Sequence, residues 1–185
     1  MSEPRPMIRV HVLRSRRADD GEPSVRIRIS WYAEEVTTDA DEVRRTALAL
    51  LRARWWLDAH QRLTAAGLSD ERAAGLLGPL PTGTDGTEGP DRTGNADDSG
   101  FRVSIGPGGS VRLARPGIRI RALIPRAEVD AMATGWLRIA ESAEADLRLL
   151  QALRHTTELP QARVDDLFAY LWVLRSDDPL SELDG

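Results

Sequence analysis

Two segments near the beginning of the chain alternate apolar and polar residues with a period of two, and this pattern constrains the fold most. Residues 8–13 read IRVHVL, and residues 25–32 read VRIRISWY. Such alternation is typical of β-strands that bury one face, because successive side chains point to opposite sides of a strand. The residues between the two segments are rich in Asp, Gly, Pro and Ser, which favour connecting loops. The sequence therefore predicts an antiparallel hairpin.

The same alternation returns in the second half of the chain. Residues 101–105 (FRVSI) and 111–113 (VRL) flank the turn sequence GPGGS, which indicates a second hairpin. After a break at Arg115-Pro116-Gly117, residues 118–124 (IRIRALI) alternate again. They predict a third strand in this half.

Apolar residues spaced three and four apart, together with capping residues, predict four helices. We expect Thr38 to be the N-cap of the first helix and Ser69 that of the second, and Pro125 to be the first residue of the third. The predicted helices cover about residues 39–64, 69–77, 125–154 and 162–175.

A glycine-rich acidic stretch separates the two halves. Residues 81–100 contain five glycines, five acidic residues and no apolar side chain larger than alanine, so the stretch is predicted to be disordered. The predicted fold class is α+β, with two halves that each hold a β-hairpin and a long helix, forming antiparallel sheet packed by helices. The predicted segments are a tail (1–7), a hairpin with helices (8–79), a linker (80–100), a hairpin and third strand with two helices (101–176) and a second tail (177–185).

The composition excludes several kinds of chemistry. The chain has no Cys, which rules out disulfides, thiolate nucleophiles and cysteine-ligated metals. All 25 basic residues are Arg, as in proteins of GC-rich bacteria, and the lack of Lys rules out Schiff-base catalysis and a Walker-type phosphate loop. No stretch resembles a signal peptide or a membrane span, so we expect a cytoplasmic protein without membrane contact.

Arginine occupies the polar side of the predicted strands. Residues 101–126 hold six Arg and no acidic residue, although the net charge of the chain is −4. Guanidinium groups on an open sheet face can grip phosphates, which predicts an anion-binding or nucleic-acid-binding surface. The alternative interpretation is an ordinary solvated face, neutralised by acidic helices or by the acidic stretch at 81–100. The candidate residues are Arg9, Arg26, Arg28, Arg102, Arg112, Arg119 and Arg121.

Tryptophans supply the candidates for a protein interface. Trp55 and Trp56 are adjacent on a predicted helix, so they lie about 100° apart and cannot both enter one narrow core stripe. Trp136 lies in the apolar stripe of the third helix. All three are candidate interface residues, because exposed Trp is common at interfaces, and the alternative is that they pack in the core.

The residues for catalysis are sparse. No two His have metal-ligand spacing, and no Ser lies in a Gly-x-Ser-x-Gly elbow. We therefore expect no catalytic residue, metal or cofactor. The leading hypothesis is a non-catalytic protein-interaction or assembly module whose partner is itself or another protein. The competing hypothesis is a nucleic-acid-binding or regulatory protein that uses the arginine-rich sheet face.

Overall fold

The computed structural model describes residues 8–15, 24–79, 100–156, 160, 162–164, 166–168 and 170. The two predicted tails, nearly all of the predicted linker and the end of the fourth predicted helix lie outside these residues. The chain divides into two compact units, which are described separately. The first unit comprises Met1–Arg14 and Val25–Glu144, and the second comprises Ser15–Ser24 and Ala145–Gly185.

The first sheet of unit one contains three strands in the order β1-β2-β3, so the hairpin expected here gains a third strand. The strands are β1 (Arg9–Ser15), β2 (Ser24–Trp31) and β3 (Glu34–Thr38). Strands β2 and β3 pair antiparallel, with Ile27 opposite Thr38 and Trp31 opposite Glu34. Two residues therefore connect them, and the first, Tyr32, has a φ of 52°.

The second sheet is a three-stranded antiparallel sheet in the order β4-β5-β6, as expected for this half. The strands are β4 (Arg102–Ile105), β5 (Val111–Ala114) and β6 (Arg121–Ile124), with a short 3-10 turn, Pro107–Gly109, between the first two. The third strand is shorter than predicted because it begins at Arg121 and not at Ile118. Val103, Val111 and Leu113 are buried on one side of the sheet. Strands β4 and β5 contact helix α1 (Ala40–Ala65), which precedes the sheet in the chain.

Helix α1 (Ala40–Ala65) begins one residue later than the sequence suggested. Its N-cap is Asp39, whose side chain accepts a hydrogen bond from the backbone N–H of Glu42 at 2.8 Å. The prediction of Thr38 as N-cap was wrong, because Thr38 is the last residue of β3 and its hydroxyl donates to the Glu42 carboxylate. Helix α2 (Asp70–Leu77) is capped by Ser69, as predicted.

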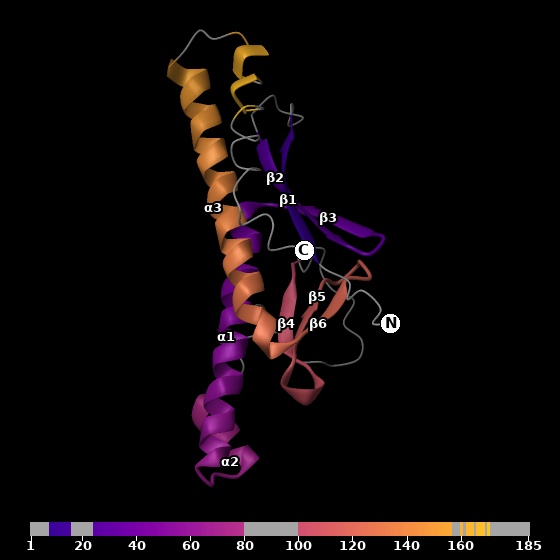
Figure 1. Cartoon of the computed structure of the whole chain (residues 1–185), viewed down its shortest axis with the longest axis vertical. Helices are drawn as coiled ribbons and strands as arrows, with labels where there is room; N and C mark the ends of the chain where they lie inside the picture. The colour runs from indigo at the N-terminus through magenta and orange to yellow at the C-terminus, as the bar shows by residue number, and fades with distance from the viewer. Residues whose placement is uncertain are drawn as a thin grey trace. The chain divides into compact units, whose positions relative to one another are not determined.

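Helix α3 (Arg126–Thr156) follows Pro125 and lies beside α1 over its first part (Figure 1). Ion pairs join the two helices in antiparallel order: Arg126 with Asp58, Asp130 with Arg54, and Glu144 with Arg44. Residues 126–144 of α3 belong to unit one and the remainder to unit two.

One carboxylate connects both sheets to α1. Glu42 accepts from the hydroxyl of Thr38 and, at 3.2 Å, from the backbone N–H of Phe101. The Glu42 carboxylate also lies 3.0 Å from the guanidinium of Arg115, and both side chains are largely buried, at 15% and 9% exposure. Arg115 covers the ring of Phe101, which packs edge-on against Trp136. Glu42 therefore holds together segments that are distant in sequence.

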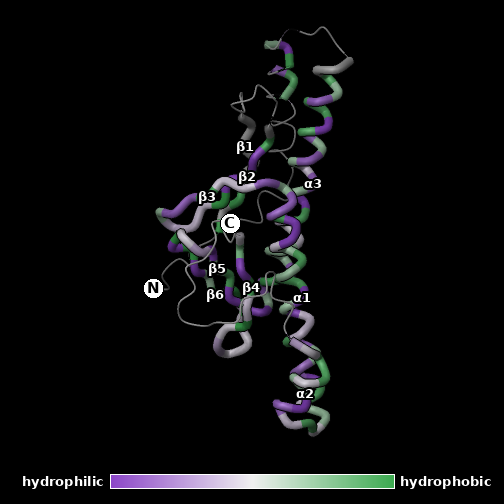
Figure 2. The backbone as a smooth tube through the Cα atoms, turned by 180° about the vertical axis from the view of Figure 1, so that it is seen from behind, coloured by the Kyte–Doolittle hydropathy of each residue, from purple (hydrophilic) through white to green (hydrophobic). Residues whose placement is uncertain are grey.

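The core of unit one consists of the inner sides of the sheets and helices, and the hydropathy colours alternate accordingly along α1 and the strands (Figure 2). Val43, Ala47 and Leu50 of α1 are fully buried, as are Val129 and Ala133 of α3. In unit two, the described residues 162–164, 166–168 and 170 are helical, and Val164, Phe168 and Asp146 are buried.

The α+β class is confirmed: two small antiparallel sheets are packed with long helices. In each half, three strands precede a long helix. Within the described part of the chain, no helix is long and apolar enough to cross a membrane.

Candidate functional site

Three of the four arginines predicted for the second sheet lie together on its outer side. In the pairing register, Arg102 and Arg121 flank Ala114, and Arg112 lies between Ser104 and Leu123. Arg102, Arg112 and Arg121 are all exposed, whereas the intervening Val103, Leu113 and Ala122 are buried. The three exposed arginines are called the β4–β6 arginine face. Alternation along each strand produces it, as the sequence predicted.

The arginines of this segment differ in what surrounds them. Arg115 and Arg126 pair with Glu42 and Asp58 and serve the packing of the unit. Arg119 is exposed in the connection between β5 and β6. Among the described residues, no carboxylate forms an ion pair with Arg112, Arg119 or Arg121. The positive charges of Arg112 and Arg121 on this face are therefore not compensated by a described acidic side chain.

Arg26 and Arg28 lie in β2 of the first sheet. Arg28 has an acidic neighbour, Glu35, that was not expected from the sequence. The Nε of Arg28 lies 3.7 Å from the Glu35 carboxylate, which also accepts from Ser30 at 3.4 Å. Glu35 belongs to β3, the strand that was not predicted, so its approach to Arg28 was not foreseen. The backbone of Arg9 lies in β1, and its side chain is outside the described atoms.

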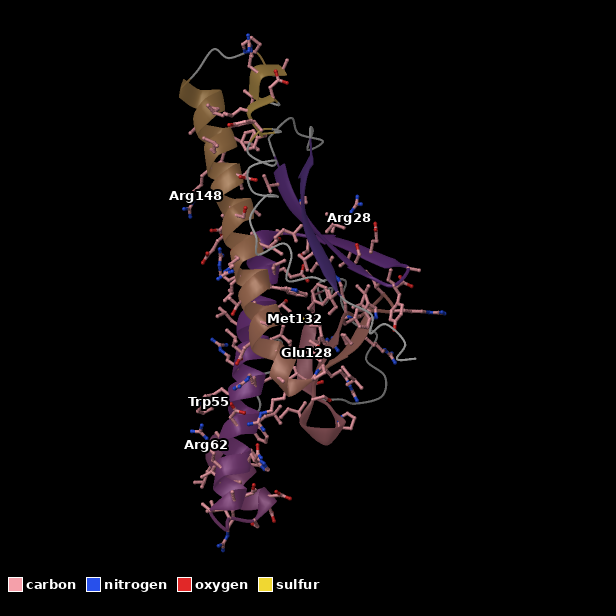
Figure 3. The ribbon with its side chains drawn as sticks, viewed as in Figure 1. Arg28, Trp55, Arg62, Glu128, Met132 and Arg148 are labelled. Atoms are coloured by element: carbon pink, nitrogen blue, oxygen red, sulfur yellow. The ribbon has the colours of Figure 1, made fainter. Side chains whose placement is uncertain are left out.

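A second candidate surface lies on α1. Asp41, Leu48, Trp55 and Arg62 are spaced seven residues apart, which places them on one side of the helix, along a line that drifts by about 20° with each step. This set is called the α1 outer line. The Trp55 side chain is 62% exposed, Leu48 is 39% exposed and the Asp41 side chain is 77% exposed. Trp55 and Arg62 project from the side of α1 that faces away from the β4–β6 sheet (Figure 3).

The other sides of α1 are occupied within unit one. Val43 and Leu50 are fully buried on the side that contacts β4 and β5. Arg44 and Arg54 reach α3, and the hydrogen bond with Glu144 raises the pKa of Arg44 above its usual value. The α1 outer line is thus the side of the helix left to solvent.

The other two candidate tryptophans have structural contacts. Trp56 is half-buried, donates its indole N–H to the backbone carbonyl of Gly78 at 3.2 Å and stacks on His60. It therefore fixes α2 against α1. Trp136 is only 3% exposed and packs on Phe101, so it belongs to the core. Of the three candidates, Trp55 alone is available on the surface of its unit.

The described residues supply little for catalysis. A hollow of about 440 Å³ beside the β4–β5 turn is lined by Gly108, Gly109, Ser110, Leu123, Pro125 and Arg126. Its one hydroxyl, on Ser110, donates to the Pro107 carbonyl at 2.8 Å, and no His or carboxylate lines it. No group of three or more His, Asp or Glu in the described ranges is arranged to hold a metal.

Comparison with known proteins finds no family model that matches the chain, and no match among curated proteins or solved structures.

Proposed function

We propose that the protein is a non-catalytic interaction or assembly module that self-associates through the α1 outer line. The observation that carries this proposal is the 62% exposure of Trp55, with Leu48 exposed on the same line. Trp is enriched among the residues that dominate binding energy at protein interfaces. The module is assigned to the cytoplasm of a GC-rich bacterium on composition alone.

The exposed apolar surface of Trp55 is large enough to contribute to the free energy of self-association. Covering about 100 Å² of Trp55 in each copy would contribute roughly 2–3 kcal/mol per copy, at about 25 cal/mol per Å². Leu48 adds a smaller apolar contact on the same line. These contributions fit a weak, concentration-dependent association, because ordering and rigid-body entropy oppose it.

The test is a concentration series by sedimentation velocity or light scattering. The wild-type chain should shift from monomer to dimer as concentration rises, and Trp55→Ser should abolish the shift. Leu76→Ser is the matched control, since Leu76 is 70% exposed on α2, and it should behave as wild type. A wild-type chain that stays monomeric at the highest accessible concentration would refute self-association.

A second candidate function rests on a separate observation: Arg112 and Arg121 are exposed on the β4–β6 arginine face, and no described carboxylate forms an ion pair with either of them. Here we propose binding of a phosphate backbone, with affinity that falls steeply as salt rises. No aromatic residue lies among Arg102, Ser104, Arg112, Ala114, Arg121 and Leu123. The face therefore lacks the aromatic platform on which single strands stack, and a duplex backbone suits it better. Arg112→Ser should elute from heparin at lower salt than Arg26→Ser, which removes the same single charge.

We also infer that the two halves are copies of one β-β-β-α unit. The strand pairing supports this: Ile27 lies opposite Thr38, and Val111 lies opposite Ile124, with a long helix starting two residues after Thr38 and after Ile124. In this alignment Arg28 corresponds to Arg112. Replacing the β2–β3 loop with the longer β5–β6 connection should leave the fold intact, as measured by circular dichroism.

A further inference from the structure

Along α1, the outer line begins with an acidic residue, continues with two apolar residues and ends with a basic one. Asp41 lies at one end and Arg62 at the other, with Leu48 and Trp55 between them at equal spacing. Successive members are roughly 10 Å apart, because an α-helix rises about 1.5 Å per residue. The pattern is self-complementary: if it is reversed end to end, acid meets base and apolar meets apolar.

We propose that the partner of this surface is α1 of a second copy of the chain, packed antiparallel about a twofold axis between Leu51 and Arg52. In this register Leu48 lies opposite the partner's Trp55, and Asp41 lies opposite the partner's Arg62. The twofold symmetry makes each pairing occur twice. This inference rests on the self-association proposed above and adds its geometry.

Charge selects the antiparallel arrangement over the parallel one. Parallel helices in register place Asp41 opposite Asp41 and Arg62 opposite Arg62, so both ends of the contact repel. The antiparallel register converts both repulsions into ion pairs at the exposed rim of an apolar centre, the arrangement typical of protein interfaces. Asp41 already bonds Arg44 through one carboxylate oxygen, at 2.9 Å, and its side chain remains 77% exposed.

Helix α3 lacks the exposed Leu and Trp that α1 carries on its outer line, so a long helix in this fold does not require them. Alignment of the two helix starts places Ala127, Thr134, Glu141 and Arg148 at the positions of the α1 outer line. All four are exposed, and none is a large apolar residue. A long helix after three strands therefore forms without an exposed Leu and Trp at these positions, so the two residues on α1 are available for a contact beyond the unit.

Arg52 gives the register a distinctive signature. It is exposed next to the proposed axis, so the two copies of Arg52 approach each other and repel. A single pair of helices also buries less surface than a typical stable dimer. Both features predict a weak dimer with a dissociation constant in the micromolar range.

The test is charge reversal at the two ends of the line, followed by sedimentation equilibrium. Asp41→Arg and Arg62→Asp should each weaken dimerisation by roughly tenfold or more, since each creates two like-charge contacts. The double variant, which restores both ion pairs in reversed polarity, should return to within about threefold of wild type. Far-UV circular dichroism verifies folding, and Asp41→Asn and Arg62→Gln replace any variant that does not fold, with smaller losses of the same sign.

The outcomes separate this geometry from the proposed function. If the dimer depends on Trp55 but both single reversals leave it unchanged, the antiparallel register is wrong and self-association stands. A double variant that is weaker than either single variant also rejects the register. If the wild-type chain is monomeric at every concentration, both the register and the self-association are rejected.

Discussion

Glu35 and Arg121 occupy equivalent positions in the two sheets of unit one. Glu35 lies opposite Ser30 in the β2–β3 pair, and Arg121 lies opposite Ala114 in the β5–β6 pair. In the first sheet, the Glu35 carboxylate lies 3.7 Å from Arg28. In the second, the residue at that position is a further cation beside Arg112. The residue at this position therefore differs in charge between the two sheets: Arg28 has a carboxylate beside it, and Arg112 has another arginine.

Arg121→Glu should give the second sheet the charge pattern of the first. We expect the new carboxylate to neutralise Arg112 and to lower the salt concentration at which the chain elutes from heparin. Arg26→Glu is the matched control, because it makes the same charge change on the first sheet. Equal shifts for the two variants would mean that net charge, and not this face, governs polyanion binding.

Arg52→Ser should strengthen self-association. The substitution removes the repulsion between two cations beside the proposed axis and leaves Leu48 and Trp55 in place. We expect the dissociation constant to fall by about threefold at low salt, and by less as salt is added. Arg72→Ser, on the exposed side of α2, should leave the constant unchanged. A weaker dimer in Arg52→Ser would contradict the register.

Glu42→Gln should destabilise unit one. The change leaves the largely buried guanidinium of Arg115 without its counter-charge and weakens the acceptor for the Phe101 backbone N–H. We expect the free energy of unfolding to fall by roughly 2–4 kcal/mol in urea denaturation. Glu35→Gln, at an exposed ion pair, should cost less than about 1 kcal/mol. Similar losses for both variants would show that Glu42 has no special role.

Much of the architecture could be predicted from local patterns, and the misses have a physical reason. The second sheet, α2 and the long α3 follow from alternation, capping residues and helical stripes. Strand β3 escaped prediction because its sequence, EEVTT, has one aliphatic residue, and its turn at Tyr32 lacks the Gly or Asn that usually marks a positive φ. Pairing with β2 stabilises this strand, and such pairing is not a local property.

Some features of the candidate surfaces also follow from local sequence patterns, and others depend on contacts between distant segments. Strand alternation predicted the β4–β6 arginine face, because exposure there depends on the period of the strand. The neutralising role of Glu35 and the contact of Glu42 with Arg115 depend on pairing between distant segments, which single-sequence patterns do not specify. Adjacent tryptophans could be placed on different sides of α1, but only the position of α2 determined that Trp56 is covered and Trp55 is not.

The most direct test of self-association through α1 uses cysteine cross-linking, which is unambiguous because the natural chain has no Cys. In the proposed register, the two copies of position 52 are one residue apart along helices whose axes lie roughly 10 Å apart, so the two thiols of Arg52→Cys are close enough to be joined. Those of Ala59→Cys lie roughly 22 Å apart along the helix axis. A short bis-maleimide should therefore cross-link Arg52→Cys efficiently and Ala59→Cys poorly. Equal cross-linking of both variants, or of Ala59→Cys alone, would contradict the account.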